Sequence, residues 1–335
     1  MLKYILKRIA ISIIVLLGVS MIIYTLVRLM PNDYIDIKFS QQLQNGSIKQ
    51  SDIDAFKDLY GIGDDSFFGI IQGYFKWLGS LLQGDLGFSF KHEAPVASVI
   101  GENMWISFAI ALIATILQFL IAIPLGISSA THQYSVRDYT VTVFTMIGIS
   151  LPTYFFAAIV VKVFAVNLGW LPVNGLISPA ANYPDTFMGF MQKFGDIAEH
   201  LVLPIFCSVI LSIGGLMRYT RTNTLEVLNA DYIRTARAKG LSEKKVIYKH
   251  AFRNTMIPIA TLLAGILPSL FGGMMITEEV FAIPGIGRLA YHCLLEGDIP
   301  FIMGYNMFLA VLTVIGTLFS DIMYSLVDPR VKLGK

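Results

Sequence analysis

Apolar residues in this chain gather in six long runs, and most polar and charged residues fall between them. A helix needs about 20 mainly apolar residues to cross a bilayer, and each run is near that length or longer. The pattern therefore predicts an all-α polytopic membrane protein with six transmembrane helices. They are expected near residues 9–30, 104–130, 139–166, 201–217, 257–277 and 303–327.

Proline and glycine interrupt several of these runs. Proline lacks the backbone N–H that continues a helix, so it bends or caps the span that contains it. The residues concerned are Pro124, Pro152, Pro258, Pro268 and the pair Gly272–Gly273. We expect bends or caps at the prolines and a loosened span at the glycine pair.

The loops between the runs alternate in charge, and this alternation predicts their orientation. Residues 31–100 hold nine acidic and five basic side chains, whereas the loop 218–256 holds nine basic and three acidic ones. Lys and Arg are enriched on the cytoplasmic side of membrane proteins. We therefore expect both termini and the 218–256 loop in the cytoplasm.

These patterns divide the chain into four parts. The first run is too long for a signal-peptide core and "LVRLMPND" offers no small-residue cleavage site, so it is expected to remain as an anchor. The predicted parts are an N-terminal transmembrane helix (1–30), a large extracytoplasmic segment (31–103), a five-helix core (104–327) and a cytoplasmic tail (328–335). Within the second part, "GIIQGYFKWLGSLLQG" is expected to form short helices on the membrane surface.

Composition agrees with a membrane protein and narrows its chemistry. Of 335 residues, 55% are hydrophobic and 14% are charged, against about 25% charged in soluble domains. The sequence has no G-x-x-x-x-G-K-[ST] loop, so nucleotide binding has to come from separate chains. The two cysteines and five histidines show no metal-ligand spacing, so no metal and no catalytic residue is expected on this chain.

The densest positive charge lies in one interior loop, at 231–254, where seven residues are Lys or Arg and two are Asp or Glu. Asp231 is expected to cap a short helix through Lys239, Gly240 to break it, and Ser242 to start a second helix to about His250. The residues alone leave two interpretations open. The loop binds anionic lipid headgroups, or it docks on a cytoplasmic partner.

The sequence of this loop resembles that of a known protein family. The stretch "YIRTARAKGLSEKKVIYKHAFRNTMIP" is similar to the cytoplasmic signature loop of ABC importer permeases in the dipeptide, oligopeptide and nickel branch. Arg234, Thr235 and Ala236 stand where the general signature has Glu-Ala-Ala, which is a departure from it. Further matches are "GDLGFSF" at 84–90, "WLPVNG" at 170–175, "EEVFAIPGIGRL" at 278–289 and "SLVDPRV" at 325–331. The N-terminal anchor and the long segment after it resemble the B-type member of the permease pair.

The resemblance implies a function and a set of partners. It implies a non-catalytic permease subunit of an ATP-driven, binding-protein-dependent importer in a bacterial plasma membrane. Its partners would be a homologous second permease, two ATP-binding subunits that hold ATP and Mg, and an extracytoplasmic substrate-binding protein. The coupling element that contacts the ATPase would comprise Arg234, Thr235, Ala236, Lys239, Gly240 and Leu241.

Two further groups of residues are candidates for contact with substrate. Polar residues inside a membrane span are functional candidates when they face a cavity. The pathway candidates are Thr115, Gln118 and Asp321, each of which has a plain helix–helix contact as its alternative role. A re-entrant lip at the outer mouth is expected to include Glu278, Glu279, Phe281, Pro284 and Gly285. For this lip and for the long outer segment, structural cover of the helix bundle stays open as the alternative role.

The substrate is expected to be an oligopeptide or, next, a dipeptide. The same family also imports nickel, metal chelates and glutathione-like peptides, which stay open as alternatives. An ion-gradient secondary transporter would predict inverted repeats and several buried ionisable residues, of which only Asp321 qualifies. A membrane enzyme is disfavoured because no nucleophile–base constellation is present.

Overall fold

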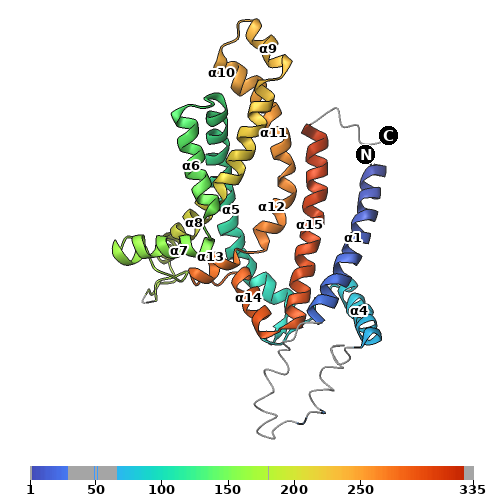
Figure 1. The fold of residues 1–335 in the computed structure, drawn as a ribbon. Helices are drawn as coiled ribbons and strands as arrows, with labels where there is room; N and C mark the ends of the chain where they lie inside the picture. The colour runs from blue at the N-terminus through green and yellow to red at the C-terminus, as the bar shows by residue number, and fades with distance from the viewer. Residues whose placement is uncertain (1, 29–48, 50, 52–65, 180, 328–335) are drawn as a thin grey trace.

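The structure, a computed structural model, describes residues 2–28, 49, 51, 66–179 and 181–327 (Figure 1). Within these residues the regular secondary structure is helical apart from one two-stranded antiparallel hairpin. The helices of the N-terminal half are α1 (Leu2–Arg28), α4 (Phe67–Leu82), α5 (Val96–Thr131), α6 (Val136–Ser150), α7 (Thr153–Val160) and the π-helix η1 (Val161–Asn167). The others are α8 (Phe187–Leu228), α9 (Asp231–Ala238), α10 (Glu243–Lys245), η2 (Val246–Ala251), α11 (Phe252–Thr261), α12 (Leu263–Phe271), α13 (Met275–Val280), α14 (Ile286–Glu296) and α15 (Ile299–Val327). The hairpin pairs β1 (Phe88–Ser89) with β2 (Ala94–Pro95).

Four of these helices are long and apolar enough to cross a membrane: α1, α5, α8 and α15. They coincide with four of the predicted runs, although α5 and α8 extend well beyond them. If the bent pair formed by α6 and α7–η1 is counted as one span, the described residues contain five candidate spans. The all-α membrane fold is therefore confirmed, and the count of six stays a prediction.

The predicted span 139–166 is sharply bent at Pro152, where a bend or cap was expected. Helix α6 ends at Ser150, and the following helix pair α7–η1 turns away from it by 106°. The cause is Pro152, which is the N-cap residue of α7 and cannot donate the N–H that would continue α6. Leu151 before it is extended, as a residue preceding proline prefers.

The predicted span 257–277 is also divided. Helix α11 ends at Thr261, α12 runs over Leu263–Phe271, and α13 begins only at Met275. Gly273 lies between α12 and α13 with a φ of +70°, a conformation that side chains with a Cβ rarely adopt. The expected loosening at the glycine pair is thus a complete break.

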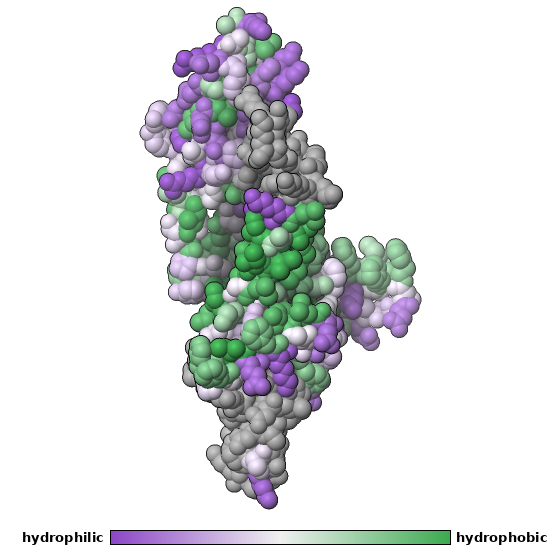
Figure 2. All heavy atoms as spheres, turned by 90° about the vertical axis from the view of Figure 1, so that its right-hand side faces the viewer, coloured by the Kyte–Doolittle hydropathy of each residue, from purple (hydrophilic) through white to green (hydrophobic). Residues whose placement is uncertain are grey.

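The molecule is elongated along the direction of its long helices (Figure 1). Helices α5 and α8 form its most extensive contact, and glycines let them approach closely. A Cβ on Gly126 of α5 would lie 2.7 Å from the carbonyl oxygen of Met217 on α8, which explains why no larger residue fits. Figure 2 shows apolar side chains over the middle of the molecule and more hydrophilic ones at the end formed by α9 and α10.

Only part of the predicted 31–103 segment is described. Helix α4 occupies the apolar stretch predicted to form surface helices, and Ser66 caps it by accepting a hydrogen bond from the Gly69 N–H. Residues 31–48, 50, 52–65 and the predicted tail 328–335 lie outside the described residues. The role of the segment and the division into four parts stay predictions.

Candidate functional site

One end of the molecule is a compact helical projection, which we call the knob (residues 231–251; Figure 1). The predicted helix, glycine turn and second helix are all present. Gly240 has a φ of +74° and reverses the chain between α9 and α10. Two details differ: Ala230 rather than Asp231 is the N-cap of α9, and α10 continues through η2 into α11.

The knob has its own small core. Ile233 and Val246 are completely buried, and Ala236 and Ala251 lie beside them. Ile233 and Ala236 are three residues apart, so they share one face of α9 and turn it towards η2. Val227 and Leu228, at the end of α8, pack against the same core. The knob is therefore seated on α8.

The predicted coupling residues separate into an outer and an inner group. Arg234, Thr235, Lys239 and Gly240 are exposed, and Leu241 is half-buried. Ala236 is buried inside the knob, so its side chain supports the shape rather than the outer surface. Arg237 bridges the turn by donating from Nε to Glu243 Oε1 at 2.7 Å. The outer surface of the knob is thus predominantly basic. The contact between Arg237 and Glu243 fastens α9 to α10 across the turn.

A buried ion pair joins the helices beneath the knob. Arg221 of α8 donates from Nε and Nη2 to the two carboxylate oxygens of Asp138 on α6, each at 2.9 Å. Ser129 of α5 donates to the same carboxylate, and Asp138 is only 3% exposed. The pair ties α5, α6 and α8 together. Nothing along the chain indicates this pairing, because the two residues are 83 positions apart.

The predicted lip residues come together at the opposite end. Glu278 of α13 is completely buried and accepts hydrogen bonds from Ser107 Oγ at 2.7 Å, Met274 N at 2.8 Å and Arg288 N at 2.9 Å. Phe281 and Gly285 are buried close by, while Pro284 is exposed. The motif at 278–289 is thus a folded-back element, which we call the Glu278 element, and the side chain of Glu278 anchors it in the interior.

Glu279 faces the outside of the same element. Its Oε2 accepts from Arg288 Nε at 3.0 Å and lies 3.0 Å from His292 Nε2. Partial burial opposes ionisation of this carboxyl, but the hydrogen bonds from His292 and Arg288 outweigh that effect and lower its pKa. Glu279 is therefore a charged group that pins α14 to α13.

The loop between η1 and α8 connects this element to α8. Asp196 of α8 accepts hydrogen bonds from Ser178 N at 2.7 Å, Ser178 Oγ at 2.6 Å and Tyr183 Oη at 2.5 Å. The bond to Asp196 raises the pKa of Tyr183 to about 12, so the phenol stays a donor at physiological pH. Gly175 N donates to Phe281 O at 2.8 Å, which joins the "WLPVNG" and "EEVFAIPGIGRL" motifs directly.

The pathway candidates do not converge. Gln118 donates from Nε2 to the carbonyl oxygen of Ser212 at 3.0 Å, so it links α5 to α8. Thr115 is half-buried one turn away, and Asp321 lies in α15 with its side chain outside the described part of the structure. A groove of about 430 Å³ lies between α7, α8 and α13, and we call it the membrane groove. It is lined by Thr153, Ser208, Leu211, Ser212, Met274, Met275, Ile276 and Thr277.

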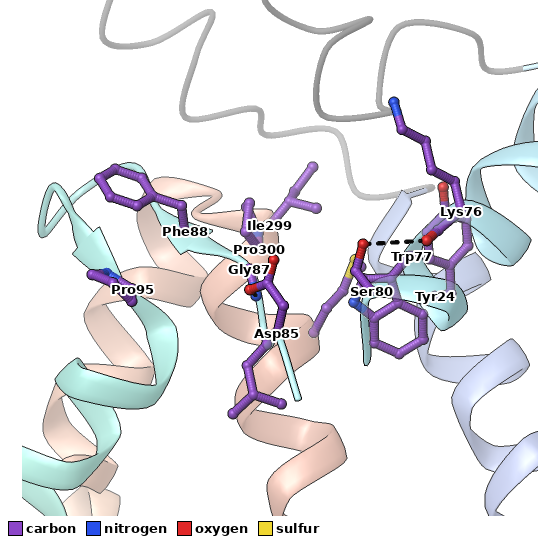
Figure 3. Close-up of a pocket in the computed structure, with 12 residues that line it drawn as sticks. Tyr24, Lys76, Trp77, Ser80, Asp85, Gly87, Phe88, Pro95, Ile299 and Pro300 are labelled. Atoms are coloured by element: carbon purple, nitrogen blue, oxygen red, sulfur yellow. Dashed lines mark hydrogen bonds between the residues drawn. The ribbon is translucent and has the colours of Figure 1, made fainter. Parts of the chain in front are cut away.

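A second cavity, of about 470 Å³, lies between α1, α4, the 85–87 loop, the hairpin strands and α15. Figure 3 shows Phe88 and Pro95 on one side of it and Tyr24, Trp77 and Ser80 on the other. Its walls are mainly apolar, and Asp85 is one of its few polar groups. It unites segments that are far apart in the sequence, so periodicity along the chain could not predict it.

Comparison with known proteins agrees with this architecture. Residues 122–333 match the family described as "Binding-protein-dependent transport system inner membrane component". The chain is 37% identical to the oligopeptide transport system permease protein AppB of Bacillus subtilis (strain 168), over 99% of this chain and 100% of that protein. It is also 34% identical to a putative peptide permease protein of Brucella ovis and 32% identical to the dipeptide transport system permease protein DppB of Alkalihalophilus pseudofirmus. Both of these alignments cover 99% of this chain and 100% of the relative.

The match therefore extends over nearly the whole chain and includes the knob, the membrane groove and the Glu278 element. The resemblance drawn from the signature loop is confirmed by the family and by the peptide permeases among its relatives. This chain belongs to the family of binding-protein-dependent transport system inner membrane components.

Proposed function

We propose that this chain is one transmembrane subunit of an ATP-driven importer of oligopeptides or dipeptides. The observation that carries the proposal is the knob, a rigid basic projection with its own core at the end of a membrane-length helix. A headgroup-binding loop would need only charge, whereas a mechanical contact needs a fixed shape. The similarity to peptide permeases over the whole chain supports the substrate class.

The knob acts as the coupling element to an ATP-binding subunit. Arg234, Thr235, Lys239 and Gly240 present the contact surface, Leu241 flanks it, and Ala236 maintains its shape. An exposed basic projection is steered towards a partner surface of opposite charge. Two ATP-binding subunits supply the nucleotide sites with ATP and Mg, and a second, homologous permease forms the other half of the pathway.

The membrane architecture has six spans with both termini in the cytoplasm. Two of the six are irregular: the bent pair α6 and α7–η1, and the divided run α11–α12. Irregular backbone at membrane depth is tolerated where it is covered by protein or lines a cavity. The membrane groove beside α13 and the hydroxyls of Ser208 and Ser212 fit such a lining.

The Glu278 element and the 31–103 segment lie on the outer face, where a substrate-binding protein delivers peptide. In the transport cycle, ATP binding draws the knobs of the two permeases together and opens the pathway outward. Hydrolysis then returns the complex to its inward-facing state. This scheme requires only that ATP and loaded binding protein both favour the outward state.

Reconstitution tests this function. The complete complex in proteoliposomes should take up a labelled tripeptide only with ATP and binding protein present, and binding protein loaded with peptide should stimulate ATP hydrolysis. Peptide uptake driven by a proton or sodium gradient without ATP would refute the proposal.

A further inference from the structure

The break between α12 and α13 is held open by specific contacts. Tyr305 of α15 donates from Oη to the carbonyl oxygen of Gly272 at 2.6 Å, at the start of the break. At its end, Met274 N donates to Glu278 Oε1 at 2.8 Å, and Glu278 N donates back to Met274 O at 2.8 Å. The unwound segment 272–274 is therefore fastened at both ends.

The carboxylate of Glu278 connects this segment to two other helices. Oε1 also accepts from Ser107 Oγ of α5, and Oε2 accepts from Arg288 N of α14. Ser107 Oγ in turn accepts from Ile286 N at 2.9 Å. All of these groups are buried or part-buried, so each donor that loses its acceptor incurs a desolvation penalty.

The packing around the Glu278 carboxylate leaves no room for a further side-chain atom at the neighbouring glycines. A Cβ on Gly285 would lie 2.4 Å from Glu278 Oε2, and a Cβ on Gly273 would lie 2.4 Å from Gly287 N. These distances are too short for any real Cβ contact, so the glycines are needed for the carboxylate to reach its donors. A side chain of other length or charge could not satisfy the same set.

The segment that Glu278 fastens is a wall of the membrane groove. Met274, Met275, Ile276 and Thr277 line that groove opposite Ser208 and Ser212 of α8. We propose that Glu278 is a positioning residue for transport, which fixes the place of residues 274–277 in the groove without touching substrate itself. This inference rests on the proposed function.

A matched buried carboxylate provides the control. Asp298 is also completely buried and accepts from Ser89 Oγ at 2.6 Å, Lys91 N at 3.1 Å, Phe90 N at 3.3 Å and Phe301 N at 3.4 Å. It joins the β1–β2 hairpin to α15 and does not border the groove. Glu278→Gln and Asp298→Asn each replace one carboxylate oxygen by an amide group that cannot accept.

The first readout is transport per assembled complex. Glu278→Gln should lower peptide-stimulated ATP hydrolysis and raise the KM for peptide uptake by about tenfold, with basal hydrolysis within about twofold of wild type. Asp298→Asn should lower the yield of complex without changing the KM. Equal effects of both variants per assembled complex would show a general structural role and overturn the proposal.

The second readout reports the groove wall directly. Met275 is 42% exposed, so a Met275→Cys reporter is accessible to a permeant maleimide. Glu278→Gln should change its labelling rate at least about threefold, whereas Asp298→Asn should leave it unchanged. An unchanged rate in Glu278→Gln would refute the positioning role.

Two provisions keep the test decisive. If Glu278→Gln does not assemble, Ser107→Ala removes one donor while keeping the carboxylate, and it should give a smaller change in the same two readouts. No change in either readout would count against the proposal. If wild-type complex takes up no peptide, the proposed function fails, but the labelling comparison still judges the positioning role.

Discussion

Single residues in this protein act mainly by allowing or fixing unusual backbone geometry. Gly240 and Gly273 have φ values of +74° and +70°, and each stands where a helix has to stop. Nothing lies within 4 Å of a Cβ built on Gly240, so the constraint there is conformational. At Gly273 both conformation and space forbid a side chain.

The first prediction concerns Gly240. Gly240→Val places a β-branched residue at positive φ and should distort the turn between α9 and α10 while leaving the membrane helices intact. We expect normal insertion and at least about a tenfold loss of peptide-stimulated ATP hydrolysis, measured in reconstituted complex. Gly240→Asn is the matched control, because Asn tolerates positive φ far better, and it should retain most activity. Wild-type coupling in an assembled Gly240→Val complex would remove the coupling assignment.

The second prediction concerns the native thiols. Burial raises the pKa of Cys293 to about 12, so the thiol stays protonated and unreactive at pH 7 to 9. Cys207 is also completely buried. Maleimide labelling of the folded wild-type complex should therefore be negligible at pH 8 and should appear on denaturation. Rapid labelling of Cys293 in the native complex would contradict its complete burial.

At the scale of elements, the sequence predicted which helices exist better than where each helix is interrupted. The runs that became α1, α5, α8 and α15 were recognisable because apolar length alone identifies them. The knob was predictable because Gly240 is flanked by two helical patterns. The interruptions at the prolines and at the glycine pair were expected, but the 106° angle and the complete division of the later span were not. A proline can kink a helix or end it, and tertiary contacts decide which.

The same limit applies to the candidate site. The motif at 278–289 indicated a lip, but its sequence could not show that Glu278 points inward to Ser107 while Glu279 points outward to Arg288. Likewise Arg221 and Asp138 are separated by 83 residues, so their pairing follows only from the α6–α8 contact. Local patterns along the chain contain no information on such partners.

The third prediction tests the joint of α5, α6 and α8. Asp138→Asn leaves the part-buried Arg221 without its carboxylate, and removing one partner of such a pair typically costs about 3 kcal/mol. Thermal unfolding of the purified complex should therefore shift to lower temperature. The double variant Asp138→Asn/Arg221→Gln should lose clearly less than the sum of the two single variants. Strict additivity would show that the pair makes no energetic contact.

The fourth prediction concerns orientation of the loops. Single cysteines at Ser51 and Ser242, in a chain without reactive native thiols, should behave oppositely towards an impermeant thiol reagent in intact cells. Ser51→Cys should be labelled from outside, and Ser242→Cys only after the membrane is permeabilised. Outside labelling at both sites would overturn the proposed topology.

At the scale of the whole molecule, the chain has two working ends and a groove between them. The knob is basic, the Glu278 element is anchored by buried hydrogen bonds, and the membrane groove lies between α7, α8 and α13. An open groove of this kind is completed by a second subunit in the proposed complex. The knob, the Glu278 element and the membrane groove therefore fit a subunit of a larger complex.

The fifth prediction follows from this incompleteness. The purified chain alone, in proteoliposomes, should neither bind ATP nor take up peptide, with or without an ion gradient. Equilibrium binding of a fluorescent ATP analogue and labelled-peptide uptake are the measurements. Adding the ATP-binding subunits and the second permease should give ATP binding, and adding ATP and the peptide-binding protein as well should give peptide uptake. Gradient-driven uptake by the single chain would favour a secondary transporter.

Helix α8 connects the knob to the opposite end of the molecule. Its 42 residues span about 63 Å at about 1.5 Å per residue, roughly twice the hydrocarbon thickness of a bilayer. Asp196 near one end holds the 178–183 loop, while Val227 and Leu228 at the other end are part of the knob core. One continuous helix therefore joins the knob to the 178–183 loop, and we expect a displacement of the knob to be transmitted along α8 and the α5 helix packed against it.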